Sequence, residues 1–248
     1  MSTSVEGIVL KSFNYGEHHK ILKVITHHHG IIGVFVQNAN RTNNKKSALV
    51  QPVTCAHFNL KQSNSTSGGL YYLYNGEVIN HYLNVKLDYE AMIYIYLVIE
   101  IVLKGLKSEE DVSYYHVYEM LKTVLDLAEQ GVSSQLLAIV FQFKMLTILG
   151  IEPQLDCCAN CHKTQQIVML SITGGGLMCE RCVNVQEPIL IDASLIPLVR
   201  ALARVNLAAL AEVEVEQEFL TTISTFLTYY YEQYAGFHLS TKKFINSL

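Results

Sequence analysis

The sequence predicts an α+β protein of two domains: an N-terminal five-stranded barrel, and a C-terminal all-helical domain that carries an embedded four-cysteine zinc module. Three observations support this prediction. Short apolar runs with a period of two fill residues 1–80, runs with a helical period fill most of residues 81–248, and two C-x2-C pairs interrupt the helical part within residues 152–187. We therefore expect a domain boundary near residue 80 and a zinc module inserted into the second domain.

Composition and charge limit the possible functions. Half of the 248 residues are apolar, which is enough to bury a sizeable core without help from a metal. The net charge of −4 argues against a strongly nucleic-acid-binding protein when it is taken alone. The charge is uneven, however. Residues 1–80 hold seven basic and three acidic residues, a net +4, and residues 81–248 hold eleven against nineteen, a net −8. This asymmetry suggests that the two parts have different partners.

The sequence also bears on location. The opening MSTSVEGIVLKS has no cationic stretch followed by a long apolar run, so we expect no secretion signal. The longest apolar run, residues 91–103, contains Glu100 and is too short to cross a bilayer, so we expect no membrane contact. With two C-x2-C pairs and no signal, a reducing cytoplasm is the expected compartment.

Five short strands are expected in residues 1–80, and glycines at expected turns punctuate them, for example Gly16 and Gly30. The strands are expected at Val5–Leu10, Ile21–Thr26, Ile31–Gln37, residues 55–61 and Leu70–Val78. In the fourth strand the alternation places Ala56 on the core face and Cys55 on the opposite face. Five such strands fit a Greek-key barrel of the OB-fold type, and an SH3-like barrel fits nearly as well.

A basic loop, residues 38–48, is expected between the third and fourth strands, and it contains no acidic residue. Such a loop beside a barrel face is a plausible phosphate contact, and lysines on the first two strands would extend the basic surface. An ordinary solvated loop is the alternative, and it is favoured when the loop is taken alone. The candidate DNA-binding residues are Arg41, Lys45, Lys46, Lys11, Lys20 and Lys23.

Helical periodicity begins after the barrel. Helices are expected at Asp88–Leu106, from a cap at Ser113 to a stop at Gly131, at Gln135–Leu149, at Ala193–Val205 and at Glu216–Tyr234. The first and third are apolar on almost every side, so we expect them to be buried at the centre of the helical domain.

The cysteine spacing predicts a metal centre. Seventeen residues separate the two C-x2-C pairs, which are Cys158 with Cys161 and Cys179 with Cys182. This spacing fits the four-thiolate zinc template, whose closed tetrahedron leaves no position for water and is therefore structural. Redox-active or core cysteines are the alternative. Cys157 could replace Cys158 only by changing the spacing to C-x3-C. An apolar run and three glycines between the pairs predict a hairpin.

Common enzyme motifs are missing from the sequence. It has no P-loop, no H-E-x-x-H, no G-x-S-x-G and no H-x-E with P-C-x-x-C. We therefore expect a protein that is not an enzyme and has no small-molecule substrate.

Three stretches resemble the RecO family of bacterial DNA repair proteins. They are GIVLKSFNYGEHHKILKVITHHHGIIGVFVQNANR at the start, PQLDCCANC with GGGLMCERC in the cysteine module, and HLSTKKFINSL at the end. The resemblance runs almost from end to end. It implies an OB-fold, a helical domain and a zinc module. It also implies binding to single- and double-stranded DNA, annealing of complementary strands, partnership with RecR, and relief of the SSB block so that RecA can load, in the cytoplasm at the nucleoid.

Two expectations accompany the resemblance. The family is expected to recognise the acidic, apolar C-terminal tail of SSB. Arg200 and Arg204 lie one turn apart on an expected helix and could grip the tail's carboxylates, although a solvated helix face is the favoured alternative. The competing function is a zinc-stabilised adaptor whose barrel binds protein instead of nucleic acid.

Overall fold

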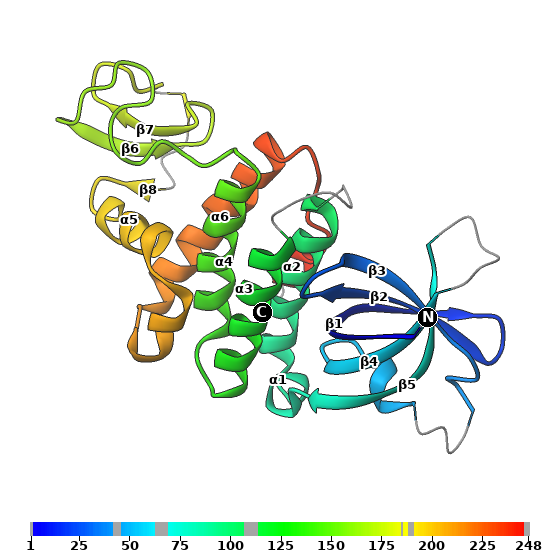
Figure 1. The fold of residues 1–248 in the computed structure, drawn as a ribbon. Coiled ribbons are helices and arrows are strands. Elements are labelled where there is room, and N and C mark those ends of the chain that lie inside the picture. The colour runs from blue at the N-terminus through cyan, green and yellow to red at the C-terminus, as the bar shows by residue number, and fades with distance from the viewer. Residues whose placement is uncertain are drawn as a thin grey trace. The chain divides into compact units, whose positions relative to one another are not determined.

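The computed structural model describes residues 2–41, 46–62, 69–106, 114–184, 186–187 and 191–245. The chain divides into two compact units (Figure 1). The barrel unit comprises Met1–Asp88 with Leu106–Glu129, and the helical unit comprises Tyr89–Gly105 with Gln130–Leu248. The predicted fold class is confirmed: a closed five-stranded barrel, a helical C-terminal region and a group of four close cysteines.

The barrel is built from five strands that pair in the order β1-β2-β3-β5-β4 and close on themselves. They are β1 (Ser2–Tyr15), β2 (His19–Thr26), β3 (Gly30–Val36), β4 (Cys55–Gln62) and β5 (Tyr71–Asn80). β3 and β5 pair in parallel and the other pairs are antiparallel. This closed Greek-key barrel is the predicted OB-fold.

Alternation along the strands fills the barrel interior. Leu22, Val24 and Phe58 belong to one buried apolar cluster, because every second side chain of a strand points to the same face. The 3-10 turn η1 (Ala48–Val50) adds Leu49 and Val50 to this cluster. The barrel therefore has an apolar core of its own.

Helices α1 (Leu83–Leu87) and α3 (Tyr114–Glu129) belong to the barrel unit. The carboxylate of Glu6 on β1 accepts hydrogen bonds from the Tyr118 hydroxyl and Lys122 Nζ of α3, each at 2.7 Å. The bond from Lys122 holds the pKa of Glu6 below its ordinary value, although burial opposes this. The predicted boundary at residue 80 assigned α3 to the helical domain, since a helical period does not reveal the packing partner.

Cys55 differs from its expected position. It was expected on the outer face of the fourth strand, but it is fully buried. A register shift between Cys55 and Ala56 breaks the alternation there. The sulfur lies 3.9 Å from the Tyr118 hydroxyl, and burial raises the pKa of the thiol to about 11. The expectation failed because it assumed strict alternation and no helix over that side of the barrel.

The helical unit centres on α4 (Ser134–Ile148), which packs against α2 (Tyr89–Gly105), α5 (Ile196–Arg204) and α6 (Gln217–Tyr234) (Figure 1). The unit also contains η2 (Leu207–Glu212) and α7 (Lys242–Ile245). Most side chains of α2 and α4 are buried, as their apolar sequences predicted. Ser133 caps α4 by accepting a hydrogen bond from the Leu136 amide. The expected cap at Ser113 lies outside the described residues.

The C-terminal segment is attached to α2 through Glu100. Its carboxylate accepts hydrogen bonds from Lys104 and from the backbone and hydroxyl groups of Ser240 and Thr241, which precede α7. Burial favours the neutral acid, but these donors outweigh it and lower the pKa of Glu100 to about 2. The carboxylate is therefore a charged anchor for the end of the chain. Among the described helices, none combines the length and apolar character needed to cross a membrane.

Candidate metal centre and candidate nucleic-acid interface

The cysteine module folds as a small ribbon within the helical unit. Its strands are β6 (Ile167–Ser171), β7 (Gly176–Cys179) and β8 (Ile191–Asp192), in the order β7-β6-β8. The predicted hairpin between the cysteine pairs is thus present as β6 and β7. Gly176 is required where the ribbon meets the preceding segment, because a Cβ atom there would lie only 2.6 Å from the Gln154 carbonyl oxygen. In Figure 1 the ribbon lies at one end of α4 and α6.

Four cysteine sulfurs converge at the base of this ribbon. The Sγ atoms of Cys158, Cys161, Cys179 and Cys182 all lie within 4.8 Å of one another. Cys161 Sγ and Cys179 Sγ are 3.6 Å apart, too far for a disulfide, and all four cysteines are free. Zinc–sulfur bonds of about 2.3 Å arranged as a tetrahedron place neighbouring sulfurs about 3.8 Å apart. The geometry and the thiolate chemistry therefore fit a single tetrahedral metal ion.

Cys157 lies outside this group. Its sulfur is 3.9 Å from His162 Nδ1, and Cys158 is the neighbour that joins the cluster. The first pair in the structure is thus Cys158 with Cys161, at the C-x2-C spacing.

The thiols of the cluster differ in how readily they lose a proton. Burial opposes ionisation of Cys158, but amide groups around it, including those of Cys161 and Cys179, outweigh burial and lower the pKa of this thiol to about 6. The opposite holds at Cys182, where contact with Cys161 and the other sulfurs raises the pKa to about 12. Several thiolates in such a small space repel one another, and a cation among them removes that repulsion.

The ribbon is attached to the helices by polar contacts. The Tyr234 hydroxyl of α6 donates to the Ile172 carbonyl at 2.8 Å. Arg200 Nε donates to the Leu155 carbonyl at 2.6 Å, and Arg204 forms an ion pair with Asp156. Both arginines predicted for the SSB tail therefore contact the segment that leads into the ribbon. Sequence reasoning did not find these partners, because no local pattern links α5 to residues some 45 positions earlier.

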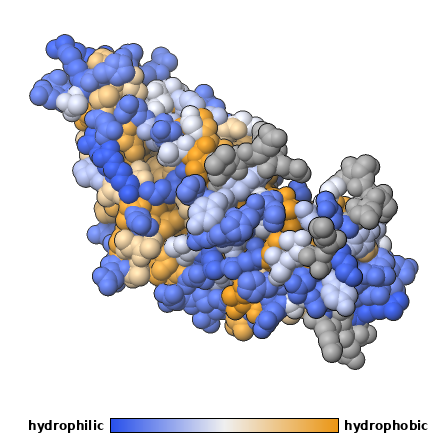
Figure 2. Space-filling model, viewed as in Figure 1, coloured by the Kyte–Doolittle hydropathy of each residue, from blue (hydrophilic) through white to orange (hydrophobic). Residues whose placement is uncertain are grey.

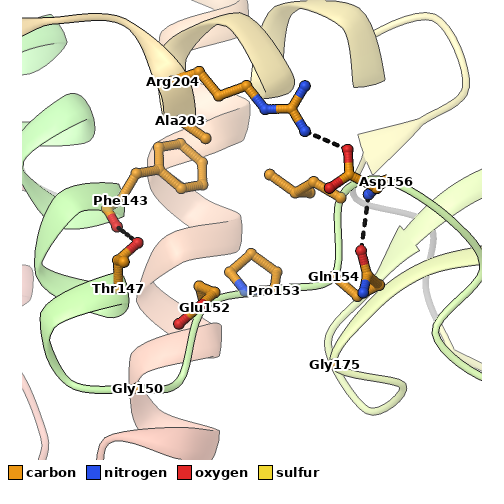
Figure 3. A pocket seen from close by; sticks show the side chains of 11 residues that line it. Phe143, Thr147, Gly150, Glu152, Pro153, Gln154, Asp156, Gly175, Ala203 and Arg204 are labelled. Carbon is orange, nitrogen blue, oxygen red and sulfur yellow. Dashed lines mark hydrogen bonds and ion pairs between the residues drawn. The ribbon is translucent and has the colours of Figure 1, made fainter.

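A hollow of about 660 Å³ opens beside the Arg204–Asp156 pair. Figure 3 shows Phe143, Pro153 and Ala203 around it, with the Arg204 guanidinium directed towards Asp156. Figure 2 shows hydrophilic residues around the ribbon and apolar residues gathered beside it over α5. The walls of the hollow are mostly polar and include the acids Glu152 and Asp156, with an apolar part formed by residues such as Phe143 and Ala203 and with Arg204 as the one cation among the lining residues.

The structure brings two of the predicted DNA-binding lysines together. Lys11 of β1 and Lys23 of β2 are direct cross-strand partners, and both are exposed. Lys20 lies farther along β2, opposite Asn14 and Val36. The other three predicted DNA-binding residues, Arg41, Lys45 and Lys46, belong to the basic loop. Arg41 is exposed, Lys46 Nζ donates to the Leu73 carbonyl at 2.9 Å, and Lys45 lies outside the described residues.

Comparison with known protein families identifies both halves of the chain. The family model described as "Recombination protein O N terminal" matches residues 1–82, and "Recombination protein O C terminal" matches residues 86–243. A "DNA repair protein RecO" of Bacillus pumilus is 30% identical over 250 residues, covering 98% of this chain and 93% of the relative. Relatives of the same name in Bacillus cytotoxicus and Bacillus subtilis are 30% and 29% identical over 250 residues. These two alignments cover 100% of this chain and 98% and 95% of the relatives.

Proposed function

The chain belongs to the RecO family of DNA repair proteins, and from this premise we propose that it binds single- and double-stranded DNA and anneals complementary strands. With RecR, it helps RecA load onto SSB-coated single-stranded DNA. We place this activity in the cytoplasm, at the nucleoid. Annealing forms no covalent bond, so the protein acts without enzymatic chemistry: it lowers the repulsion between two phosphate chains, and base pairing supplies the specificity.

The cross-strand pair of Lys11 and Lys23 supports this proposal most directly. Like charges placed directly opposite each other on adjacent strands destabilise a sheet. A phosphate held between the two ammonium groups removes this repulsion. The pair lies within residues 1–80, which carry a net charge of +4 in a chain whose total net charge is −4.

The metal ion is proposed to be zinc, bound by Cys158, Cys161, Cys179 and Cys182. Four sulfur ligands at tetrahedral separations are the preferred environment of structural zinc, and they leave no open position for a substrate. The ion would hold the ribbon together and take no part in a reaction.

The hollow beside α5 is the proposed site for the SSB tail. Phe143 and Ala203 would take the tail's apolar side chain, and Arg204 would exchange Asp156 for a tail carboxylate. Arg200, which donates to the Leu155 carbonyl, would keep the wall of the hollow in place. Leu202 on the same helix is buried and is not among the residues that line the hollow, so it contributes to packing.

A tail peptide distinguishes this site from a solvated helix face. Arg204→Ala should weaken binding of a fluorescent SSB-tail peptide. Asp156→Asn should strengthen it, because the competing carboxylate is removed. Equal affinity in the parent and both variants would exclude the hollow as the tail site.

The DNA-binding proposal is tested by fluorescence anisotropy of labelled single-stranded DNA at several salt concentrations. Affinity should fall steeply with salt, and Lys11→Gln with Lys23→Gln should reduce the salt slope by roughly 0.7 for each lost phosphate contact. Lys163→Gln, an exposed lysine of the ribbon, is the matched control and should leave the slope unchanged. A second variant, Arg41→Gln with Lys45→Gln, tests the basic loop. Binding that does not respond to salt would favour the protein-binding adaptor.

A further inference from the structure

One row of cross-strand partners crosses all five strands on the outer face of the barrel. Neighbours in the row are paired in the strand register. In the order β1, β2, β3, β5 and β4, the row consists of Phe13, Ile21, Phe35, Tyr72 and Lys61. We call the first four residues the aromatic row. It combines three aromatic rings and one aliphatic side chain on a surface of an otherwise closed barrel.

The aromatic row is not part of the barrel core. Phe13 is 39% exposed and Tyr72 is 41% exposed, and neither belongs to the apolar cluster that fills the barrel. The rings contact each other instead: Phe35 and Tyr72 have centroids 5.2 Å apart, and Tyr15 meets Phe35 edge-on at 5.9 Å. Tyr15 itself is 57% exposed. Packing of the fold therefore does not account for this group of open rings.

Cations lie at both ends of the aromatic row. Lys11 Nζ lies 5.0 Å from the ring centroid of Phe13, beside its cross-strand partner Lys23. At the other end, Lys61 Nζ lies 4.5 Å from the ring centroid of Tyr74, which is 62% exposed. Open aromatic rings next to positive charges are the combination by which proteins hold single-stranded nucleic acids. The rings stack on bases of any sequence and the cations hold the phosphates.

We propose that the aromatic row is a base-stacking platform for single-stranded DNA, with Lys11, Lys23 and Lys61 holding the phosphates on either side. The inference rests on the proposed DNA-binding function and names the surface and the chemistry that select unpaired strands. In a duplex the faces of the bases are covered by neighbouring base pairs, so the aromatic rings cannot stack on them and add nothing to the affinity for a duplex. A strand on the platform stacks the faces of its bases on the rings and keeps the pairing edges accessible. Pairing with a complementary strand ends this stacking, which favours departure of the annealed product.

Three ligands of equal length separate stacking from phosphate binding. They are a mixed-sequence single strand, the same sugar–phosphate chain without bases, and the corresponding duplex, each titrated against full-length protein by anisotropy. The parent should bind the normal strand most tightly. Phe35→Leu with Tyr72→Leu should lose about tenfold or more in affinity for that strand alone, at an unchanged salt slope. Affinity for the other two ligands should stay within about twofold.

Three further variants serve as controls. Tyr229→Leu removes an exposed ring that also lies beside a lysine, 4.4 Å from Lys242 Nζ on the helical unit, and should change nothing. Phe35→Tyr keeps the ring and should retain the preference for bases. Unchanged binding of the base-free chain and of the duplex by the double Leu variant would show that this variant is folded. Lys11→Gln with Lys23→Gln should weaken all three ligands and reduce the salt slope.

The outcomes separate this inference from the function on which it rests. Equal losses for all three ligands in the double Leu variant, or no loss for any, would overturn the stacking platform while DNA binding itself stands. The second of these results would leave the row as a surface for a protein partner. A parent protein that binds none of the three ligands would overturn the proposed function, and the platform with it.

Discussion

The barrel and the metal-binding ribbon are both small, mainly antiparallel β structures, yet they are stabilised in different ways. Among the residues that the structure describes, the barrel encloses an apolar cluster of thirteen buried side chains. The buried cluster of the ribbon has four, and two of these are Cys158 and Cys179 of the metal group. The barrel can therefore rely on its own core, because its strands close around one. The ribbon is an open three-stranded sheet that does not close around a core, and we expect it to depend on the ion.

The comparison is tested most strongly by removing one thiolate. Cys158→Ser should reduce the metal content from one ion per chain to almost none. The ribbon should then open, because structural zinc contributes on the order of 10 kcal/mol in small metal-dependent folds. Metal analysis and amide exchange at Met169 and Leu170 measure both effects. The barrel should keep its protection.

Cys157→Ser is the matched control and should keep both the ion and the ribbon. Full metal in Cys158→Ser together with none in Cys157→Ser would show that the ligand set is wrong. Loss of protection in the barrel would show that the barrel, too, depends on the metal.

The converse change removes core from the barrel. Leu22→Ala empties a fully buried position and should reduce the free energy of unfolding of the barrel unit by about 2–5 kcal/mol. Denaturant unfolding measures this loss, and Glu77→Ala at an exposed position of β5 should change it by less than about 0.5 kcal/mol. The metal content should be unchanged, and a loss of zinc here would contradict separate stabilisation.

The Glu100 carboxylate anchors the C-terminal segment, and this anchor should respond to acid, whereas the metal-binding ribbon should respond to a chelator. The pKa of Glu100 is about 2 in the folded protein, below the ordinary 4.5, so its contribution is complete above about pH 4.5 and disappears as the pH falls towards 2. Glu100→Gln should lower the free energy of opening the C-terminal segment by about 1.5–3 kcal/mol at neutral pH. It should also remove the dependence of this free energy on pH between about 4.5 and 2. Amide exchange at Ser240 and Thr241 reports the release.

A chelator at neutral pH should open the ribbon and leave this anchor closed. Glu90→Gln, an exposed acid at the start of the same helix, should behave as the parent does. If the chelator releases Ser240 and Thr241 as well, the two attachments are coupled.

The smallest expected effect concerns the contact between ribbon and helix. Tyr234→Phe removes the hydroxyl that donates to the Ile172 carbonyl and should favour local opening of the ribbon by about 0.5–1.5 kcal/mol, with the metal retained. Amide exchange in β6 measures this opening. Tyr229→Phe alters an exposed ring on the same helix and should have no effect. Metal loss in Tyr234→Phe would mean that the ribbon needs the helix as well as the ion.

Features with a local cause could be predicted from the sequence. The C-x2-C spacing brings two sulfurs onto one turn, so the four cysteines of the metal group followed from the chain itself. The five strands and the buried helices α2 and α4 followed from their periodicity. The start of α5 was predicted three residues too early, because residues 193–195 form a turn in which Asp192 binds Ser194.

Tertiary structure decided the features that join distant residues. No local pattern assigns α3 to the barrel or buries Cys55 beneath Tyr118. The strand register places Phe13 in one row with Phe35 and Tyr72, although some twenty to sixty residues separate them. Arg204, a candidate for the SSB tail with a solvated helix face as the favoured alternative, is paired with Asp156. Periodicity determines which face of an element is apolar, whereas side-chain packing and strand register between elements determine what that face meets.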